Sequence, residues 1–220
     1  MKATPSNERR QGRQRRERRE RVATQISNQK KARLSSIEIF RLDGEGLGQH
    51  LDAIAEILHA CVHDGANVGF VLPFDLNQAR AFWAEKIAPG LVANSRIVLV
   101  AKVNNQVAGT VQLNLDTPPN QPHRADVSKL LVHPKYRKLG IGRALMEQIE
   151  SYAENDGRRL LTLDTATDIA ENLYLSLGYE RAGHIPGYAR DPNEDRFVGT
   201  TIMYKVLPGS LRLVRPSAYV

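Results

Sequence analysis

The stretch VHPKYRKLGIGRALMEQIE, residues 132–150, joins a basic, glycine-containing turn to an amphipathic helix. It follows the apolar run ADVSKLLV, which is typical of a β-strand, and apolar residues then recur at helical spacing from Ile141 to Tyr152. Gly140 and Gly142 open backbone conformations that other residues avoid, so successive N–H groups can converge on one anion at the positive end of the helix dipole. The pattern predicts a compact anion-binding loop between a strand and a helix.

Formal positive charge surrounds this turn. The predicted anion-binding loop consists of Arg137, Lys138, Leu139, Gly140, Ile141, Gly142 and Arg143. Taken alone, the same residues also fit a basic helix start beside an ordinary turn. A second glycine-rich stretch, LDGEGLGQH at 42–50, also follows a strand, but it lacks the third glycine of a dinucleotide-binding turn. We interpret it as a flexible turn between a strand and a helix.

The composition indicates one domain. The chain has 220 residues, of which 41% are hydrophobic, enough for one sizeable core. The single cysteine, Cys61, excludes an internal disulfide and a cysteine-rich zinc site, and its place on an apolar helical stripe predicts an inert core thiol. The sequence shows neither an apolar run long enough to span a membrane nor the apolar region of a secretory signal. We therefore expect a soluble, cytoplasmic protein without a metal.

Positive charge is concentrated at the N-terminus. Residues 1–33 hold twelve Lys and Arg against three Glu, a net charge of +9, whereas the remaining 187 residues hold nineteen against twenty-one acidic residues, a net charge of −2. The segment has too few apolar residues to bury a helical face, so we predict a disordered tail. It is either a solubilising extension, a stretch ahead of the true start, or a segment that binds polyanions such as RNA weakly.

Strand and helix patterns alternate from about residue 36. Strands are expected at 35–42, 96–103, 106–115, 125–132, 159–165, 179–185 and 200–207, and helices at 47–62, 76–87, 141–155 and 168–177. This order predicts one α/β domain at 34–208, with a mixed, mostly antiparallel sheet and helices on both faces. The tail at 1–33 and an extension at 209–220 flank it.

Several blocks, in order, resemble the GNAT superfamily of acetyl-CoA-dependent N-acetyltransferases. They are the strand ADVSKLLVHP, the loop Arg-x-x-Gly-x-Gly with its helix, the strand RLLTLDT and the segment ENLYLSLGYE. The blocks HDGANVGF, HRADVSKLLVHP, LLTLDT and GHIPGYARDPN further resemble the tabtoxin-resistance branch, which acetylates a small toxin derived from an amino acid. The resemblance implies a GNAT-like fold with a splayed central strand pair, and acetyl-CoA as co-substrate.

The resemblance also implies where acetyl-CoA binds. Leu131 and Val132 would offer main-chain contacts to the pantetheine arm, and the loop at 137–143 would hold the pyrophosphate. Thr167 stands where many family members have an Asn that hydrogen-bonds the pantetheine. It is either a cofactor contact or the N-cap of its helix.

Transfer to an amine requires a base, because an ammonium has no lone pair with which to attack a thioester. Asp126 stands eleven residues before Arg137, as a catalytic glutamate does in the histone-acetylating branch, and Asp164 lies near the end of the neighbouring strand. The resemblance implies that one of these acids, or a water that it orders, takes the proton; either could instead cap a strand end or pair with an arginine. Strand alternation predicts one shared face for Asp126, Ser128, Leu130 and Val132.

Tyr174 matches the family tyrosine that protonates the departing CoA thiolate, with a plain core tyrosine as the alternative. By family analogy the stretches 65–74 and 184–192 line the acceptor side, with Phe70, Phe74 and Tyr188 as its walls. His133 is interpreted as a surface residue. The expected function is N-acetylation of a small amine by a monomer or homodimer. The alternatives are a protein Lys or N-terminal acetyltransferase and a module that binds nucleic acid through the tail.

Overall fold

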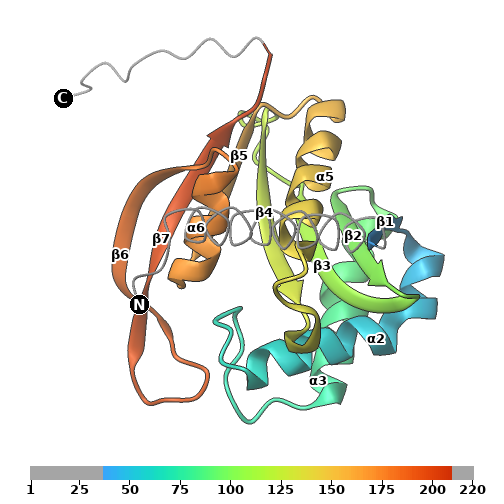
Figure 1. The fold of residues 1–220 in the computed structure, drawn as a ribbon. Coiled ribbons are helices and arrows are strands. Elements are labelled where there is room, and N and C mark those ends of the chain that lie inside the picture. The colour runs from blue at the N-terminus through green and yellow to red at the C-terminus, as the bar shows by residue number, and fades with distance from the viewer. Residues whose placement is uncertain (1–36, 210–220) are drawn as a thin grey trace, which may run out of the picture.

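The computed structural model describes residues 37–209, which form one seven-stranded sheet with helices on both faces (Figure 1). The strand order is β1-β2-β3-β4-β5-β7-β6, and neighbouring strands are antiparallel except β4 and β5, which are parallel. The mixed, mostly antiparallel sheet predicted from the sequence is thereby confirmed. The predicted tail at 1–33 and nearly all of the predicted extension at 209–220 lie outside the described residues.

The strands are β1 (Ile37–Leu42), β2 (Arg96–Val103), β3 (Gln106–Asn114), β4 (Arg124–Val132), β5 (Leu160–Thr165), β6 (Glu180–Arg190) and β7 (Phe197–Val206). The helices are α2 (Gly44–His63), α3 (Leu76–Ala81), the π-helix η1 (Phe82–Ile87), α4 (Ala88–Val92), the 3₁₀ turn η2 (Pro134–Tyr136), α5 (Ile141–Asn155) and α6 (Asp168–Ser176). Over residues 37–209, no helix has the length and apolar character that crossing a membrane requires.

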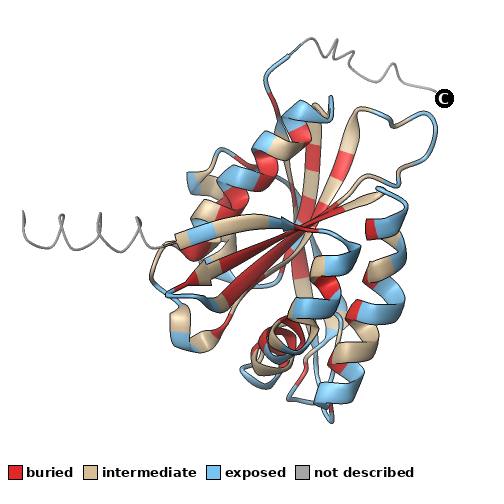
Figure 2. Cartoon of the chain, turned by 90° about the vertical axis from the view of Figure 1, so that its right-hand side faces the viewer, coloured by how far each residue is buried: buried red, intermediate tan, exposed pale blue. Residues whose placement is uncertain are grey.

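Two hydrophobic clusters lie on opposite faces of the sheet. The side chains of β2 alternate between the two clusters. Its odd-numbered residues from Ile97 to Val103 pack in the cluster with α5 and α6. Val98 and Val100 point the other way, into the cluster with α2, α3, η1 and α4. Figure 2 shows buried residues along the central strands and on the inner sides of the helices. We call the two sides of the sheet the α5 face and the α2 face.

Local sequence fixes the ends of several elements. Asp43 caps α2 by accepting a hydrogen bond from the Gly46 N–H at 2.7 Å, and Asp75 forms a capping box at the start of α3. Asn104 and Asn105 take φ angles of 49° and 62°, the left-handed conformation that closes a tight hairpin between β2 and β3. The hairpin predicted from this Asn-Asn pair is therefore present.

Several boundaries differ from the prediction, and three of these differences have a clear physical cause. Because Asp43 supplies the cap, α2 begins at Gly44, and the flexible turn predicted at 42–50 is wrong. The helix predicted at 76–87 continues through η1 into α4, where Pro89 stands at the helix start and needs no N–H partner. The strand predicted at 179–185 extends to Arg190 because it pairs with β7; its side chains are mostly exposed, so hydrophobic alternation could not reveal it.

The parallel pair β4 and β5 separates after three residue pairs. The register runs from Arg124 opposite Leu160 to Asp126 opposite Thr162, and beyond this point the two strands part (Figure 1). Residues 127–132 of β4 therefore have no backbone partner in β5. We call the opening between them and the end of β5 the fork.

A β-bulge interrupts β4 inside the fork. Lys129 has a φ of 50°, and the register with β3 shifts so that two residues of β4 oppose one residue of β3. The extra residue reverses the alternation of side chains: Val127 packs on the α5 face, whereas Leu131 packs on the α2 face.

The face predicted for this strand is consequently wrong. Asp126 and Ser128 flank Val127 and point to the α2 face, while Leu130 and Val132 pack against the α5-face cluster. Regular strand alternation cannot anticipate an inserted residue.

Candidate active site

The backbone of β4 presents a donor to the fork. The His133 N–H, just after β4, donates to the Ala108 C=O of β3 at 2.9 Å. By alternation the main-chain groups of Leu131 also face β3, and those of Val132 face the fork. The Val132 C=O is already occupied, because it accepts from the Cys61 thiol at 3.5 Å and from Arg137 Nε at 3.3 Å. The Val132 N–H is therefore the main-chain donor that this end of β4 turns toward the fork.

The predicted anion-binding loop forms a left-handed turn ahead of α5. Lys138 and Gly140 have φ angles of 64° and 89°, and Gly140 is the N-cap residue of α5. When residues in left-handed and right-handed backbone conformations alternate, successive N–H groups turn toward one point, and such an arrangement can hold an anion. No side chain from the described part of the protein caps this helix, so the first N–H groups of α5 are free to bind an anionic ligand.

Gly142 permits close packing of the loop. A Cβ at this position would lie 3.4 Å from Leu173 Cδ2 of α6 and 3.8 Å from Val132 Cγ2. Ile141 is fully buried and Leu139 packs against the same cluster, so both anchor the loop to the α5 face. The loop is thus anchored by apolar packing at the end of the fork.

Two of the three basic side chains of the loop are engaged elsewhere. Arg137 forms an ion pair with Asp64 at the end of α2. Arg143 donates to Ser176 Oγ at 2.6 Å and lies 3.8 Å from the Glu147 carboxylate. The first backbone N–H groups of α5 thus remain without a side-chain partner, whereas these two guanidinium groups are engaged.

Two residues behind the loop tie it to α2. His133 is only 6% exposed, with Nε2 at 3.0 Å from Glu56 Oε1 and Nδ1 accepting from the Lys135 N–H at 3.1 Å. The surface interpretation of His133 is therefore wrong, because the ring fills the space between η2 and α2. Burial raises the pKa of the Cys61 thiol to about 11, which agrees with the predicted core thiol.

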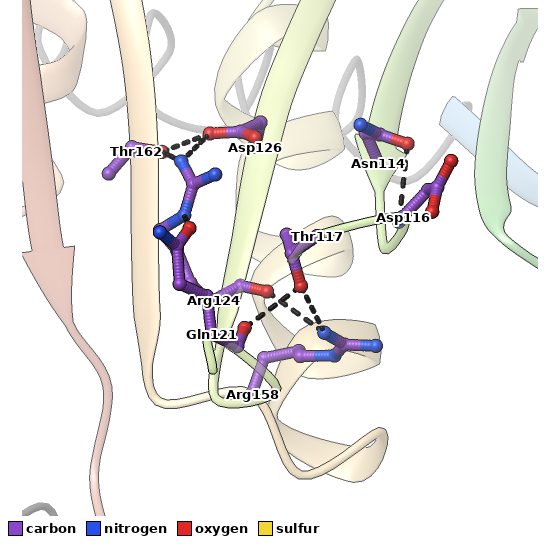
Figure 3. Close-up of polar contacts among 8 residues, drawn as sticks. All are labelled: Asn114, Asp116, Thr117, Gln121, Arg124, Asp126, Arg158 and Thr162. Carbon is purple, nitrogen blue, oxygen red and sulfur yellow. Dashed lines mark hydrogen bonds and ion pairs between the residues drawn. The ribbon is translucent and has the colours of Figure 1, made fainter. Parts of the chain in front are cut away.

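Asp126 belongs to a hydrogen-bond network at the closed end of the fork (Figure 3). Arg124 Nη1 donates to Asp126 Oδ1 at 2.6 Å and to Thr162 Oγ1 at 3.1 Å, and the Thr162 hydroxyl also donates to Asp126. Arg124 Nε binds the side chain of Gln121 at 2.8 Å. The network joins β4 to β5 at their last paired position, so Asp126 shows the arginine pairing that was the alternative to catalysis.

Asp164 lies farther along β5, in the open part of the fork. Its Oδ2 accepts a hydrogen bond from Thr200 Oγ1 at 3.0 Å, and the residue is exposed. Its negative charge adds to the rise in the pKa of Tyr174 and opposes the lowering of the pKa of Lys129, so Asp164 lies close enough to influence both groups. Of the two predicted acids, Asp164 is the more exposed residue, and Asp126 is the one paired with an arginine.

Tyr174 lies on the inner side of α6 and is 6% exposed. Burial raises the pKa of the Tyr174 hydroxyl, and the nearby Asp164 raises it further, so the phenol keeps its proton at neutral pH. Thr167 is the N-cap of α6, and its Oγ1 accepts from the Ala170 N–H at 3.3 Å. Of the two roles predicted for Thr167, the structure shows the helix N-cap.

Lys129 is a candidate residue that the sequence reasoning missed. Its Nζ donates to the Val68 C=O at 2.7 Å and lies 5.8 Å and 5.6 Å from the ring centroids of Phe70 and Phe82. Burial lowers the pKa of Lys129, and Asp164 opposes this effect. A lysine inside an otherwise apolar strand end was the available signal, because buried lysines are rare without a specific partner.

The aromatic residues predicted to line the acceptor side fall into two groups. The rings of Phe70 and Phe74 lie 4.5 Å apart, but Phe74 is only 5% exposed and belongs to the α2-face cluster. Tyr188 stands on β6 and is 55% exposed. The structure thus brings the two phenylalanines together and leaves Tyr188 on a separate, solvent-facing strand.

Sequence comparison agrees with this architecture. A profile described as the acetyltransferase (GNAT) family matches residues 51–179, which include the fork, the left-handed loop and α6. The chain belongs to this family. The predicted family and its enzyme class, an acyltransferase, are thereby confirmed.

Similar proteins give further detail within the GNAT family. The rat protein N-acetyltransferase 8F1 is 32% identical over 87 residues, which span 38% of this chain and 39% of that relative, well under half of its length. An acetyltransferase structure from Salmonella typhimurium, YncA with its cofactor acetyl-CoA, has a TM-score of 0.64 at 20% identity and covers 83% of this chain and 99% of its own. Ribosomal-protein-alanine N-acetyltransferase from Brucella melitensis has a TM-score of 0.61 at 23% identity, with coverages of 77% and 99%. At these identities the solved structures show a shared GNAT fold.

Proposed function

We propose that this GNAT protein transfers the acetyl group of acetyl-CoA to the primary amine of a small molecule. The observation that carries the proposal is the left-handed turn at Lys138 and Gly140, which presents uncapped N–H groups directly beyond an open fork. An elongated ligand with an anionic centre, such as the pantetheine and pyrophosphate of CoA, fits this combination. The Salmonella neighbour, which is described with acetyl-CoA, supports the choice of co-substrate.

The cofactor would bind along the fork. We assign the pyrophosphate to the N–H groups of the loop at 137–143 and a main-chain contact of the pantetheine to Val132. The thioester oxygen then lies near the β4 edge, where an N–H stabilises the oxyanion that forms during attack. Leu131 is not assigned a main-chain contact, because its polar groups face β3. Thr167 retains its predicted cofactor contact only if its hydroxyl donates while it caps α6.

The chemistry requires one proton acceptor and one proton donor. The neutral amine attacks the thioester carbon, the carbon–sulfur bond breaks, and an amide and free CoA form. We assign the amine proton to Asp164, directly or through a water, because it is exposed and Asp126 is bound by Arg124 and Thr162. Tyr174, whose hydroxyl stays protonated, would supply a proton to the CoA sulfur.

The acceptor is proposed to be a small, amino-acid-like amine, with toxin or antibiotic resistance as one physiological role. A contact between the two acceptor-side segments supports a small molecule: the Leu72 N–H donates to the Pro192 C=O at 3.0 Å. The second candidate is a protein amine, which the similarity to a ribosomal-protein-alanine N-acetyltransferase favours. A panel of small amines and peptides, assayed by acetyl-CoA consumption, separates the two.

The cofactor assignment is tested by a pair of variants at one position. Gly140→Asp and Gly140→Asn place nearly isosteric side chains at a φ of 89°, and Asp and Asn tolerate the left-handed conformation better than most residues. Only Gly140→Asp adds a negative charge beside the proposed pyrophosphate. Calorimetric titration with acetyl-CoA should show a dissociation constant at least about tenfold higher for the Asp variant than for the Asn variant.

Circular dichroism checks that both variants keep the fold. If the Asp variant binds acetyl-CoA as tightly as the Asn variant does, the loop does not hold the pyrophosphate and the proposal fails.

A further inference from the structure

The segment between α2 and α3, residues 64–75, spans the two halves of the split sheet. On one side it meets β4, where Val68 accepts a hydrogen bond from Lys129 at 2.7 Å. On the other side it meets the turn between β6 and β7, where Leu72 donates to Pro192 at 3.0 Å. Figure 1 shows this segment between β4 and the tip of the β6–β7 hairpin. We call it the bridging segment.

The contact with Lys129 is specific. The β-bulge puts Lys129 at a φ of 50°, a conformation that costs free energy for a lysine and is retained only where its surroundings enforce it. The ammonium then lies between one acceptor, the Val68 C=O, and two aromatic rings, those of Phe70 and Phe82. A half-buried ammonium with so few polar partners must be held there by the packing around it.

Glycine at the centre of the bridging segment allows this approach. Gly69 has a φ of 89°, which disfavours other residues, and a Cβ there would lie 3.7 Å from Lys129 Nζ. At the hairpin side, a Cβ on Gly65 would lie 3.1 Å from Asn193 Nδ2. The bridging segment therefore contacts Lys129 at its centre and packs closely against Asn193 at its first residues.

We propose that Lys129 is a specificity-determining residue, which fastens the bridging segment across the acceptor side of the fork and thereby restricts acceptors to small amines. This inference rests on the proposed acetyl transfer. Lys129 acts through the segment that it positions, without touching the reacting atoms. An amine carried by a folded protein or a long peptide would have to displace the segment before its nitrogen reached Asp164.

The inference is tested with two variants of the full chain. Lys129→Met keeps the length of the side chain but removes the donor and the charge, and Lys129→Arg keeps both. Because the Met variant removes a poorly solvated charge, it should fold. Hydrogen exchange of the amides of residues 66–72 should be about tenfold faster in the Met variant, as expected for loss of one charge-assisted hydrogen bond, and near wild type in the Arg variant.

Kinetics provide the second readout. The probes are the smallest amine that the wild type acetylates and the same amine within a long peptide. Lys129→Met should raise the KM of the small amine about tenfold, more than it lowers kcat, and should turn the peptide into an acceptor. The dissociation constant of acetyl-CoA should stay at the wild-type value.

Unchanged exchange rates, or an unchanged preference for the small amine, would overturn the role of Lys129. Failure of the wild type to bind acetyl-CoA, or to acetylate any amine, would overturn the proposed function and this inference with it. The two failures are distinguishable, because the first leaves acetyl-CoA binding and turnover intact.

Discussion

Two aspartates on neighbouring strands show how one residue type is put to different uses. Asp126 lies where β4 and β5 are still paired, and its carboxylate is bound by Arg124 and Thr162. Asp164 lies where the strands have parted and has a single hydroxyl partner, Thr200. The sequence indicated both acids as catalytic candidates. Arg124 stands two residues before Asp126 on the same strand, so this pairing was a local signal, whereas the contact with Thr162 depends on the register between two strands.

The different environments of the two aspartates predict that their substitution affects different properties of the protein. Asp164→Asn should lower kcat by about a hundredfold or more, as expected for loss of a proton acceptor, with the acetyl-CoA dissociation constant and the melting temperature unchanged. Asp126→Asn should lower the melting temperature by a few degrees, since removing the charge weakens the link between β4 and β5, worth about 1 kcal/mol. Steady-state kinetics and thermal unfolding of both variants check this. A larger loss of kcat in Asp126→Asn than in Asp164→Asn would reverse the two roles.

At the scale of elements, α5 and the loop before it were predictable because their signals are local. Helical periodicity from Ile141, the glycines and the basic residues all lie within one short stretch, and the observed α5 begins at Ile141. The bulge at Lys129 was not predictable, because it is defined by pairing with β3, which lies earlier in the chain. The same limit concealed the second half of β6, up to Arg190, because its exposed side chains carry no alternation.

The packing of α5 on the sheet depends on one small residue of β3. A Cβ on Gly109 would lie 2.9 Å from the Leu131 C=O and 3.0 Å from Ile141 Cγ2, so even alanine does not fit without movement. Gly109→Ala should destabilise the fold by about 1–3 kcal/mol and lower the melting temperature by roughly 3–8 °C.

Gly48→Ala is the matched control, because a Cβ at Gly48 meets nothing within 4 Å and the site is helical. Its melting temperature should equal or exceed that of the wild type. Equal melting temperatures for the Gly109 variant and the wild type would show that α5 can shift at no cost.

At the scale of the whole molecule, charge is divided between the tail and the rest of the chain. Residues 1–33 carry a net charge of +9 and residues 34–220 a net charge of −2. A truncated protein beginning at residue 34 should therefore elute from a heparin column at much lower salt than the full chain, while binding and consuming acetyl-CoA as before. Loss of turnover in the truncated protein, with acetyl-CoA binding retained, would show that the tail takes part in acceptor recognition and would favour the alternative function.

Binding of acetyl-CoA along the fork, as proposed, would also link the stability of the folded protein to its co-substrate. The two sheet halves share only three residue pairs between β4 and β5, so a ligand that lies along the free edge of β4 adds cohesion that the apoprotein lacks. By mass action, acetyl-CoA at a hundred times its dissociation constant would stabilise the folded chain by about 2.7 kcal/mol. In a cell, a stabilisation of this size lowers the fraction of unfolded chains that proteases can degrade. The amount of this protein would therefore follow the supply of acetyl-CoA.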